Sequence, residues 1–425
     1  MLKYKESAIL IGIRDRHKKL SEVQNSLEEL KRLAETAGAT VVGMTIQNIN
    51  HYNPAYLIGR GKAQELADNI KKDDLQTVIF DDDLSPAQQR NLEELVGAKI
   101  VDRTKLILDI FAKRAHTAEG KLQVELAQMD YLLPRLTGKG VALAQQVGGA
   151  GSMGATRGPG ERKLEYDRRR IRDHIAALHK EISKLKEYRS LQRQKRQDIP
   201  LPIIALVGYT NAGKSTLLNT MTGADVFVED KLFATLDPTT RRLTLPSRQK
   251  VLFTDTVGFI RKLPHQLIAA FRATLEEAVE ADLLLHVIDA SHPEYEEQIK
   301  TVNEVLTELG LHDKPVITVF NKIDLLKSKS SSQRLMRNHP DGVYISAAKK
   351  THLDALYRQI MAFLAKDLIE KSFVIPYEKY KLVGHLLASG NILEKEYLPG
   401  GVSIKALVDT KTFNVIKKYL RERNV

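Results

Sequence analysis

Gly208-Tyr-Thr-Asn-Ala-Gly-Lys-Ser215 is the stretch of sequence that decides the fold of the central part of the chain. It follows the apolar run from Ile203 to Val207 and opens a predicted helix, which is the context in which this pattern forms a phosphate-binding loop. Its two glycines let the backbone curl so that N–H groups converge on phosphate oxygens. Lys214 then supplies a cation to the β and γ phosphates, and Ser215 a ligand for Mg²⁺.

Three further motifs follow, each at the end of a predicted strand. Asp255-Thr-Val-Gly258 places a carboxylate near the metal and a glycine N–H near a γ-phosphate. In Asn321-Lys-Ile-Asp324 the last carboxylate can accept hydrogen bonds from the N1–H and the amine of guanine, which selects GTP over ATP. Ser346-Ala-Ala348 provides a small-residue turn that could close over the base. Because carboxyl ends of parallel strands share one edge, these motifs predict a guanine-nucleotide site.

The chain as a whole is predicted to form four parts. Residues 1–120 alternate strands and helices as a small α/β domain, and residues 121–197 form a helical hairpin with a glycine-rich loop at 138–160. Residues 198–370 form a P-loop GTPase domain with a doubly wound, mainly parallel sheet. Residues 371–425 form a small α+β domain, in which the turn from Leu398 to Gly401 joins two strands.

The acidic run Asp81-Asp-Asp83 follows the apolar run from Thr77 to Phe80. It could be a metal site, but such a run after a strand is more often a solvated loop with a helix cap, and we expect the loop. The next helix is expected to start at Ser85, with Pro86 in its first turn.

The hairpin is predicted from apolar residues at helical spacing, which are Leu122, Leu126, Met129 and Leu133 in one helix and Ile171, Ile175, Leu178, Ile182 and Leu185 in the other. The loop between them holds eight of the chain's 25 glycines and no acidic residue. The returning helix, 161–197, has 13 Lys or Arg against six Asp or Glu. A solvated face and an ordinary linker are the alternatives, but together these features favour contact with nucleic acid.

Composition limits the class of protein. With 65 Lys or Arg against 53 Asp or Glu, the net charge is +12, which favours a polyanionic partner such as nucleic acid or anionic lipid. The absence of cysteine excludes disulfides, thiol nucleophiles and thiolate metal sites. The sequence contains neither a run of eighteen apolar residues nor a signal cleavage site, so a soluble, unexported protein is predicted.

Longer motifs carry a resemblance to a known family. They are Tyr56-Leu-Ile-Gly-Arg-Gly-Lys62, Thr156-Arg-Gly-Pro-Gly-Glu161, Gly208-Tyr-Thr-Asn-Ala-Gly-Lys-Ser-Thr216 and Phe233-Ala-Thr-Leu-Asp-Pro-Thr-Thr-Arg241. The site resembles translation-factor-class GTPases of the Obg and HflX group, and the whole chain resembles the HflX GTPases. The resemblance implies that Thr235 is the switch threonine that binds Mg²⁺, which the sequence alone does not separate from Thr239 or Thr240.

The expected site contains Lys214, Thr235 and Gly258 as catalytic residues and Ser215, Thr235 and Asp255 as Mg²⁺ ligands. The residues expected to bind GTP or GDP are Gly208, Tyr209, Thr210, Asn211, Ala212, Gly213, Lys214, Ser215, Thr216, Phe233, Ala234, Thr235, Leu236, Asp237, Asp255, Thr256, Val257, Gly258, Asn321, Lys322, Ile323, Asp324, Ser346, Ala347 and Ala348.

Phe259 stands where Ras-like enzymes place a water-orienting glutamine. A phenyl ring cannot hydrogen-bond water, so unassisted hydrolysis is expected to be slow, whether or not the ring merely packs the loop. His286 lies inside an apolar run and is expected to be a core histidine, and neither it nor His265 is assigned as a base.

The resemblance implies a GTP-dependent factor that binds the large ribosomal subunit and its RNA and splits or rescues stalled ribosomes under stress. A second hypothesis is a GTP-gated binding module for a membrane or regulatory protein, and a third is an NTP-driven RNA remodelling enzyme. The family's link to ATP leaves ATP binding by the N-terminal domain open, although Gly59-Arg-Gly-Lys62 is no second P-loop. A cytoplasmic monomer with some peripheral membrane association is expected.

Overall fold

The computed structural model describes residues 6–138, 159–196, 201–223, 232–233, 236, 238–264, 276–326, 328–366, 368–380, 382–384, 386 and 392–421. The chain divides into two compact units. Unit 1 comprises Met1–Lys184 with the short stretches Lys231–Phe233 and Arg261–Phe271, and unit 2 comprises Leu185–Asp230, Ala234–Ile260 and Arg272–Val425. The division into four domains stays a prediction.

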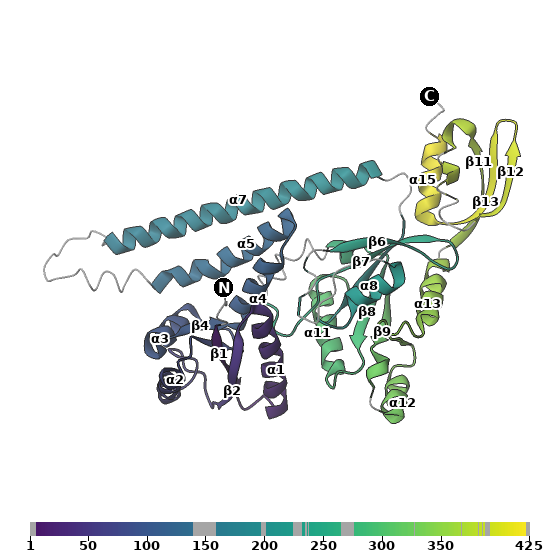
Figure 1. The fold of residues 1–425 in the computed structure, drawn as a ribbon. Coiled ribbons are helices and arrows are strands. Elements are labelled where there is room, and N and C mark those ends of the chain that lie inside the picture. Colours follow the sequence, from purple (N-terminus) through teal and green to yellow (C-terminus); the bar gives the residue numbers. More distant parts are fainter. Residues whose placement is uncertain are drawn as a thin grey trace, which may run out of the picture. The chain divides into compact units, whose positions relative to one another are not determined.

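Unit 1 contains a parallel sheet whose described strands are ordered β2-β1-β3-β4. The strands are β1 (Ser7–Arg14), β2 (Thr40–Asn48), β3 (Thr77–Phe80) and β4 (Lys99–Asp102). The helices are α1 (Leu20–Ala37), α2 (Arg60–Lys72), α3 (Pro86–Val96) and α4 (Arg103–Arg114). Helices α2 and α3 cover one face of the sheet and α1 and α4 the other, as the predicted alternation of strands and helices requires (Figure 1).

Helix α3 begins as predicted. The hydroxyl of Ser85 accepts a hydrogen bond from the N–H of Gln88, the side chain of Gln88 returns a bond to the N–H of Ser85, and Pro86 follows in the first turn.

The hairpin differs in detail from the sequence prediction. Its first helix, α5 (Ala118–Leu132), is capped by Thr117 and gives way to the 3₁₀ helix η1 (Leu133–Gly138). The buried face of α5 packs on α4 and includes Leu126 of the predicted stripe together with Val124, Ala127 and Tyr131. The other predicted residues, Leu122, Met129 and Leu133, are half-buried, so the stripe is confirmed only in part. The second helix, α7 (Pro159–Arg196), buries Leu178 as predicted. Residues 139–158 of the glycine-rich loop lie outside the described residues.

Unit 2 contains a sheet whose described strands are ordered β10-β9-β8-β5-β7-β6. They are β5 (Ile203–Gly208), β6 (Thr239–Thr244), β7 (Lys250–Asp255), β8 (Leu283–Asp289), β9 (Val316–Asn321) and β10 (Val343–Tyr344). Strand β6 pairs antiparallel with β7, and the other pairs are parallel. The sequence prediction missed β6 because its arginines interrupt the alternation of apolar and polar residues.

Helices cover both faces of this sheet. They are α8 (Lys214–Thr222), α10 (Glu276–Glu280), α11 (Tyr295–Glu308), η2 (Ile323–Leu325), α12 (Lys329–Asn338) and α13 (Leu353–Ala365). Leu217 and Leu218 of α8 share one core with Leu356 of α13. Leu335 of α12 packs with Phe320 in a second core, to which Tyr295 of α11 also belongs. The predicted doubly wound, mainly parallel sheet is therefore confirmed.

The C-terminal segment forms an antiparallel sheet of order β11-β13-β12. Its elements are β11 (Leu368–Pro376), η3 (Tyr377–Lys379), β12 (Ile392–Leu398), β13 (Gly401–Asp409) and α15 (Thr410–Arg421). The predicted turn joins β12 to β13, and a Cβ at Gly401 would lie 2.4 Å from the carbonyl oxygen of Ile375. Within the described residues, none of the helices combines the length and apolar character that a membrane span needs.

Candidate nucleotide site

The loop between β5 and α8 has the backbone that its glycines were expected to provide. Gly208 has φ +148° and Gly213 has φ +92°, both in the region that favours glycine. A Cβ at Gly208 would lie 2.2 Å from the carbonyl oxygen of Val287, and one at Gly213 would lie 2.3 Å from Nδ2 of Asn321. A side chain at either position would therefore force the loop away from β8 or from Asn321.

Lys214, the first residue of α8, is buried within this loop. Its ammonium donates hydrogen bonds to the carbonyl oxygens of Gly208, at 3.1 Å, and Tyr209, at 2.8 Å. Burial lowers the pKa of Lys214 to about 8, an effect that nearby Asp255 opposes and Lys322 reinforces. Because burial disfavours the charged form of Lys214, a negatively charged phosphate group beside the ammonium would stabilise that charge.

Ser215 and Asp255 meet beside the loop. The hydroxyl of Ser215 donates to Oδ2 of Asp255 at 2.5 Å, and the aspartate, at the end of β7, is fully buried. Hydroxyl and carboxylate oxygens are the ligands that Mg²⁺ accepts, so this pair of donors fits the metal. Thr235, the third expected ligand, lies outside the described residues, as do Ala234 and Asp237.

The segment after β7 lies directly on the loop. A Cβ at Gly258 would come within 2.8 Å of Thr210 and 3.0 Å of Nζ of Lys214. The N–H of Phe259 donates to the carbonyl oxygen of Gly208 at 3.1 Å, and its own carbonyl oxygen accepts from the N–H of Thr210 at 2.8 Å. The phenyl ring is 2 % exposed, so Phe259 packs in the interior.

Asn321 connects the loop with the two base-recognition motifs. Its Nδ2 donates to the carbonyl oxygen of Ala212 and its Oδ1 accepts from the N–H of Ala347, each at 2.9 Å. Asp324 follows on an exposed turn, where its carboxylate is accessible. The predicted convergence of these motifs at one edge of the sheet is therefore present.

Lys322 pairs with Asp289, a site partner that was not predicted from the sequence. The ammonium of Lys322 lies 2.7 Å from Oδ2 of Asp289 and donates to the carbonyl oxygen of Asn211, also at 2.7 Å. Lys322 has φ +63°, a costly conformation for a residue with a side chain. The available signal was the position of Asp289, which ends an apolar strand at the same edge as the motifs.

Two ring side chains that the sequence analysis singled out, His286 and Phe233, are buried. His286 is 3 % exposed, and burial, with a smaller effect of Lys214, lowers its pKa to about 4. The prediction of a core histidine is therefore confirmed, whereas His265 lies outside the described residues. Phe233, expected at the nucleotide, packs its ring at 4.5 Å, between centroids, against Phe111 within unit 1.

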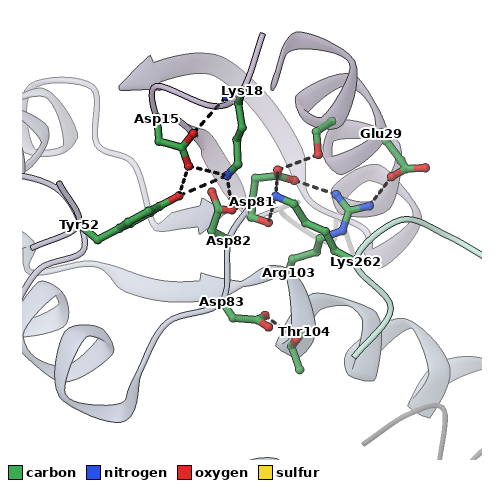
Figure 2. Close-up of polar contacts among 11 residues, drawn as sticks. Asp15, Lys18, Glu29, Tyr52, Asp81, Asp82, Asp83, Arg103, Thr104 and Lys262 are labelled. Carbon is green, nitrogen blue, oxygen red and sulfur yellow. Dashed lines mark hydrogen bonds and ion pairs between the residues drawn. The ribbon is translucent and has the colours of Figure 1, made fainter. Parts of the chain in front are cut away.

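The acidic run after β3 is solvated only in part: Asp83 is exposed and Asp82 half-buried, but the prediction of a solvated loop was wrong for Asp81. Asp81 is 2 % exposed and binds Arg103 at 2.7 Å, Lys262 at 2.6 Å and the hydroxyl of Ser26 at 2.7 Å (Figure 2). Arg103 and Lys262, which lie far from Asp81 in the sequence, offset the free-energy cost of burying its carboxylate. The helix cap is Ser85 instead. Among the described residues, no group of three acidic or histidine side chains is arranged to hold a metal.

A glycine-rich loop between strand and helix, with an aspartate, a glycine and an asparagine-lysine motif at neighbouring strand ends, defines a P-loop GTPase. Family models agree. One described as GTP-binding GTPase N-terminal matches residues 24–112, one described as GTP-binding GTPase Middle Region matches 114–196, and one described as 50S ribosome-binding GTPase matches 203–322.

Relatives that align over nearly their full length identify the family within this class of GTPases. GTPase HflX of Caldanaerobacter subterraneus subsp. tengcongensis is 51% identical over 98% of this chain and 93% of its own length. GTPase HflX of Escherichia coli K12 is 41% identical over 94% of this chain and 93% of its own length. The chain belongs to the HflX family of GTPases. A crystal structure of a GTP-binding protein from Sulfolobus solfataricus in complex with GDP aligns with 26% identity and a TM-score of 0.43, covering 84% of this chain and 98% of that one.

Proposed function

We propose that the chain is a GTP-hydrolysing factor that binds the large ribosomal subunit and splits or rescues stalled ribosomes under stress. The observation that carries the nucleotide part is the joining of the phosphate loop to both base motifs by Asn321. The ribosomal part is supported by the net positive charge of the helix 161–197, next to an acid-free glycine segment, and by membership of the family.

Each site residue receives a role in this proposal. The backbone from Gly208 to Thr216 cradles the phosphates, and Lys214 neutralises the β and γ phosphates. Ser215 and Asp255, with Thr235, would hold Mg²⁺, which neutralises charge on the phosphate oxygens. Gly258 offers its N–H to the γ-phosphate. The remaining nucleotide contacts in this proposal are made by Phe233, Ala234, Leu236, Asp237, Thr256, Val257, Lys322, Ile323, Asp324 and Ser346 to Ala348.

Hydrolysis without a partner is proposed to be slow. Phe259 replaces a water-orienting glutamine, and its ring is buried with no group that could hydrogen-bond water. The ribosome would then supply the missing positioning of water, which links turnover to the encounter with the correct partner. We place this activity in the cytoplasm and in a monomer.

ATP binding by the N-terminal domain has less support than GTP binding by the P-loop. At the carboxyl edge of its sheet, Lys18, Arg103 and Lys262 are already paired with Asp15, Asp81 and Asp82, so they are not free to bind a triphosphate. A membrane or regulatory protein partner stays an alternative, and the experiment below separates it from the ribosome.

The test is GTP turnover by the full chain with and without purified large subunits. We expect stimulation of at least about tenfold, equivalent to about 1.4 kcal/mol of the barrier. A variant with residues 139–158 replaced by a Gly/Ser segment of equal length should keep GTP binding and lose ribosome splitting. Maximal turnover without ribosomes, or unchanged splitting by this variant, would contradict the proposal.

A further inference from the structure

Three exposed tyrosines distinguish the C-terminal segment. The side chains of Tyr377, Tyr380 and Tyr397 are between 43% and 62% exposed, although most of a tyrosine side chain is apolar. Tyr377 begins the 3₁₀ helix η3 and Tyr380 follows its end, whereas Tyr397 belongs to β12. All three lie within unit 2. The fold therefore leaves three aromatic rings accessible to a partner.

One lysine brings these tyrosines together. Nζ of Lys395 lies 4.6 Å from the ring centroid of Tyr397 and 5.9 Å from that of Tyr380, distances at which a cation is attracted to a ring. The ammonium also donates a hydrogen bond to the hydroxyl of Tyr397 at 2.7 Å. The hydroxyl of Tyr377 donates to the carbonyl oxygen of Leu398 at 2.8 Å, which holds its ring beside the end of β12. We call the three tyrosines and Lys395 the tyrosine cluster.

The cluster is exposed because β12 is an edge strand of its sheet (Figure 1). Lys395 pairs with Ile404 and Tyr397 with Val402, and both partners point into the core between the sheet and α15. Paired residues share one side of a sheet. Helix α15 packs on β11 and β13, and the residues of β12 from Leu393 to Tyr397 are exposed. The core side of the sheet thus continues onto β12 as an open surface.

The acidic residues of β12 lie on the other side of the strand. Glu394 pairs with Lys405 and Glu396 with Ser403, so these carboxylates alternate with Lys395 and Tyr397. Nζ of Lys405 lies 2.9 Å from a carboxylate oxygen of Glu370 and 4.0 Å from one of Glu394. The charges on that side therefore neutralise one another within the domain, apart from the cluster.

The tyrosine cluster keeps a positive charge. The hydrogen bond to Tyr397 raises the pKa of Lys395, so its ammonium is charged at neutral pH. Within the described part of the chain, no carboxylate pairs with Lys395. Glu378 and Lys379, between the two tyrosines of η3, offset each other in charge. Residues 371–425 contain ten Lys or Arg against five Asp or Glu, so the whole segment favours an anionic partner.

Aromatic rings around an unpaired ammonium match the chemistry of single-stranded RNA. Unpaired bases stack on aromatic side chains, and lysine contacts the phosphates that join them. An acidic protein surface would satisfy the charge but offers few flat groups to stack on the rings. Double-stranded RNA keeps the faces of its bases inside the helical stack. Single-stranded RNA is therefore the partner that uses both the rings and the cation.

We propose that the tyrosine cluster of the C-terminal segment is a stacking site for unpaired bases of RNA, with Lys395 on the phosphate backbone. This inference deepens the proposed ribosomal function by giving the C-terminal segment an RNA partner, and it rests on that function only for the source of the RNA.

The test uses the absence of tryptophan from the sequence. Tyr397→Trp keeps a flat ring and introduces a single fluorescent reporter at the cluster. The full-length variant is titrated with a single-stranded oligouridylate of about ten nucleotides. We expect its fluorescence to be quenched, because a base stacks on the indole. Polyphosphate of equal charge has no bases and should not quench it.

Val374→Trp is the matched control. Val374 is exposed and pairs with Ser403, so it lies in the same sheet as Tyr397 but on the opposite side. A tryptophan at this position should not be quenched by the same oligonucleotide. RNA bound by other parts of the chain is silent in both variants, because each reporter senses only its own surroundings.

Further substitutions in the Tyr397→Trp protein separate stacking from charge. Tyr380→Ala should weaken binding of the oligonucleotide at least about fivefold, whereas Tyr380→Phe keeps the ring and should stay within about twofold. Lys395→Gln should reduce the slope of log affinity against log salt by about 0.7, the contribution of one phosphate contact. GTP binding should be unchanged in all of them, which checks that the protein is folded.

An unquenched Tyr397→Trp protein, or equal quenching of Val374→Trp, would overturn the inference. Quenching by large ribosomal subunits but not by the oligonucleotide would mean that the cluster contacts protein, and would overturn it as well. Failure of the proposed function would be seen separately, as GTP turnover of the natural protein that large subunits do not change, because the oligonucleotide titration involves neither ribosomes nor GTP.

Discussion

The parallel sheet of unit 1 and the mainly parallel sheet of unit 2 both present polar side chains at their carboxyl edges, with opposite outcomes. At the edge in unit 1, Asp81 is neutralised by Arg103 and Lys262 from the same unit. At the edge in unit 2, Lys214 is buried among backbone carbonyl groups of a glycine loop. The same topological rule placed both sets of residues.

The two edges differ in the source of the charge that balances their buried ionisable side chains. The neighbours of Asp81 hold its pKa below the ordinary value, so its charge is stable within the fold. Burial lowers the pKa of Lys214 to about 8, so nearby Asp255 compensates its charge only in part. The first edge is therefore completed by the protein, whereas the second is suited to an anion from outside. Substitutions at the two edges should affect different properties.

The largest effect is expected at Arg103, whose side chain is 1% exposed and pairs with Asp81 and Glu29. Arg103→Met should lower the free energy of unfolding by about 3–5 kcal/mol, because it leaves buried carboxylates without their partner. Chemical denaturation of the full chain measures this loss. Arg90→Met, at a partly exposed ion pair of α3, should cost no more than about 1 kcal/mol. If Arg103→Met and Arg90→Met lowered the free energy of unfolding by similar amounts, the buried ion pairs of the unit 1 edge would not be needed for stability, and the distinction between the two edges would fail.

Lys214→Ala should weaken nucleotide binding and leave the stability of the fold nearly unchanged. We expect GDP and GTP affinity to fall about 100-fold, or about 2.7 kcal/mol, because a charge-assisted contact with phosphate is lost. Without nucleotide, the free energy of unfolding should change by less than about 1 kcal/mol, since burial already disfavours the charged form. Nucleotide titration and denaturation of the same sample measure both. Destabilisation as large as that of Arg103→Met would contradict the comparison.

The smallest effect is expected at the base. Asp324→Asn should weaken GTP about 30-fold, or about 2 kcal/mol, and strengthen binding of xanthine nucleotides, whose 2-oxo group accepts where guanine donates. Competition assays with GTP and XTP report the exchange. Asp313→Asn, at a carboxylate whose side chain is 93% exposed, is the matched control. Equal losses of both nucleotides would show that Asp324 does not read the base.

Much of the fold followed from short-range patterns. The P-loop, the cap at Ser85 and the β12–β13 turn were predictable because each depends on residues within a few positions of one another. Strand β6 was missed because its arginines, exposed at an edge, hide the period of a strand. The stripe of α5 was predicted only in part because the neighbouring helix α4 selects the buried face, which adds Val124, Ala127 and Tyr131 to Leu126.

The sequence by itself determined which residues meet at the predicted nucleotide site, since the glycines, Lys214 and Asp324 stand at spacings and strand ends from which their proposed roles follow. Only the tertiary structure decided the state of Asp81. Its partner Arg103 lies 22 residues away and Lys262 lies 181 residues away, so no local pattern could show that this carboxylate is buried and paired. The physical reason is that burying a charge depends on the groups that surround it in space, and the folded chain brings those groups together from distant positions.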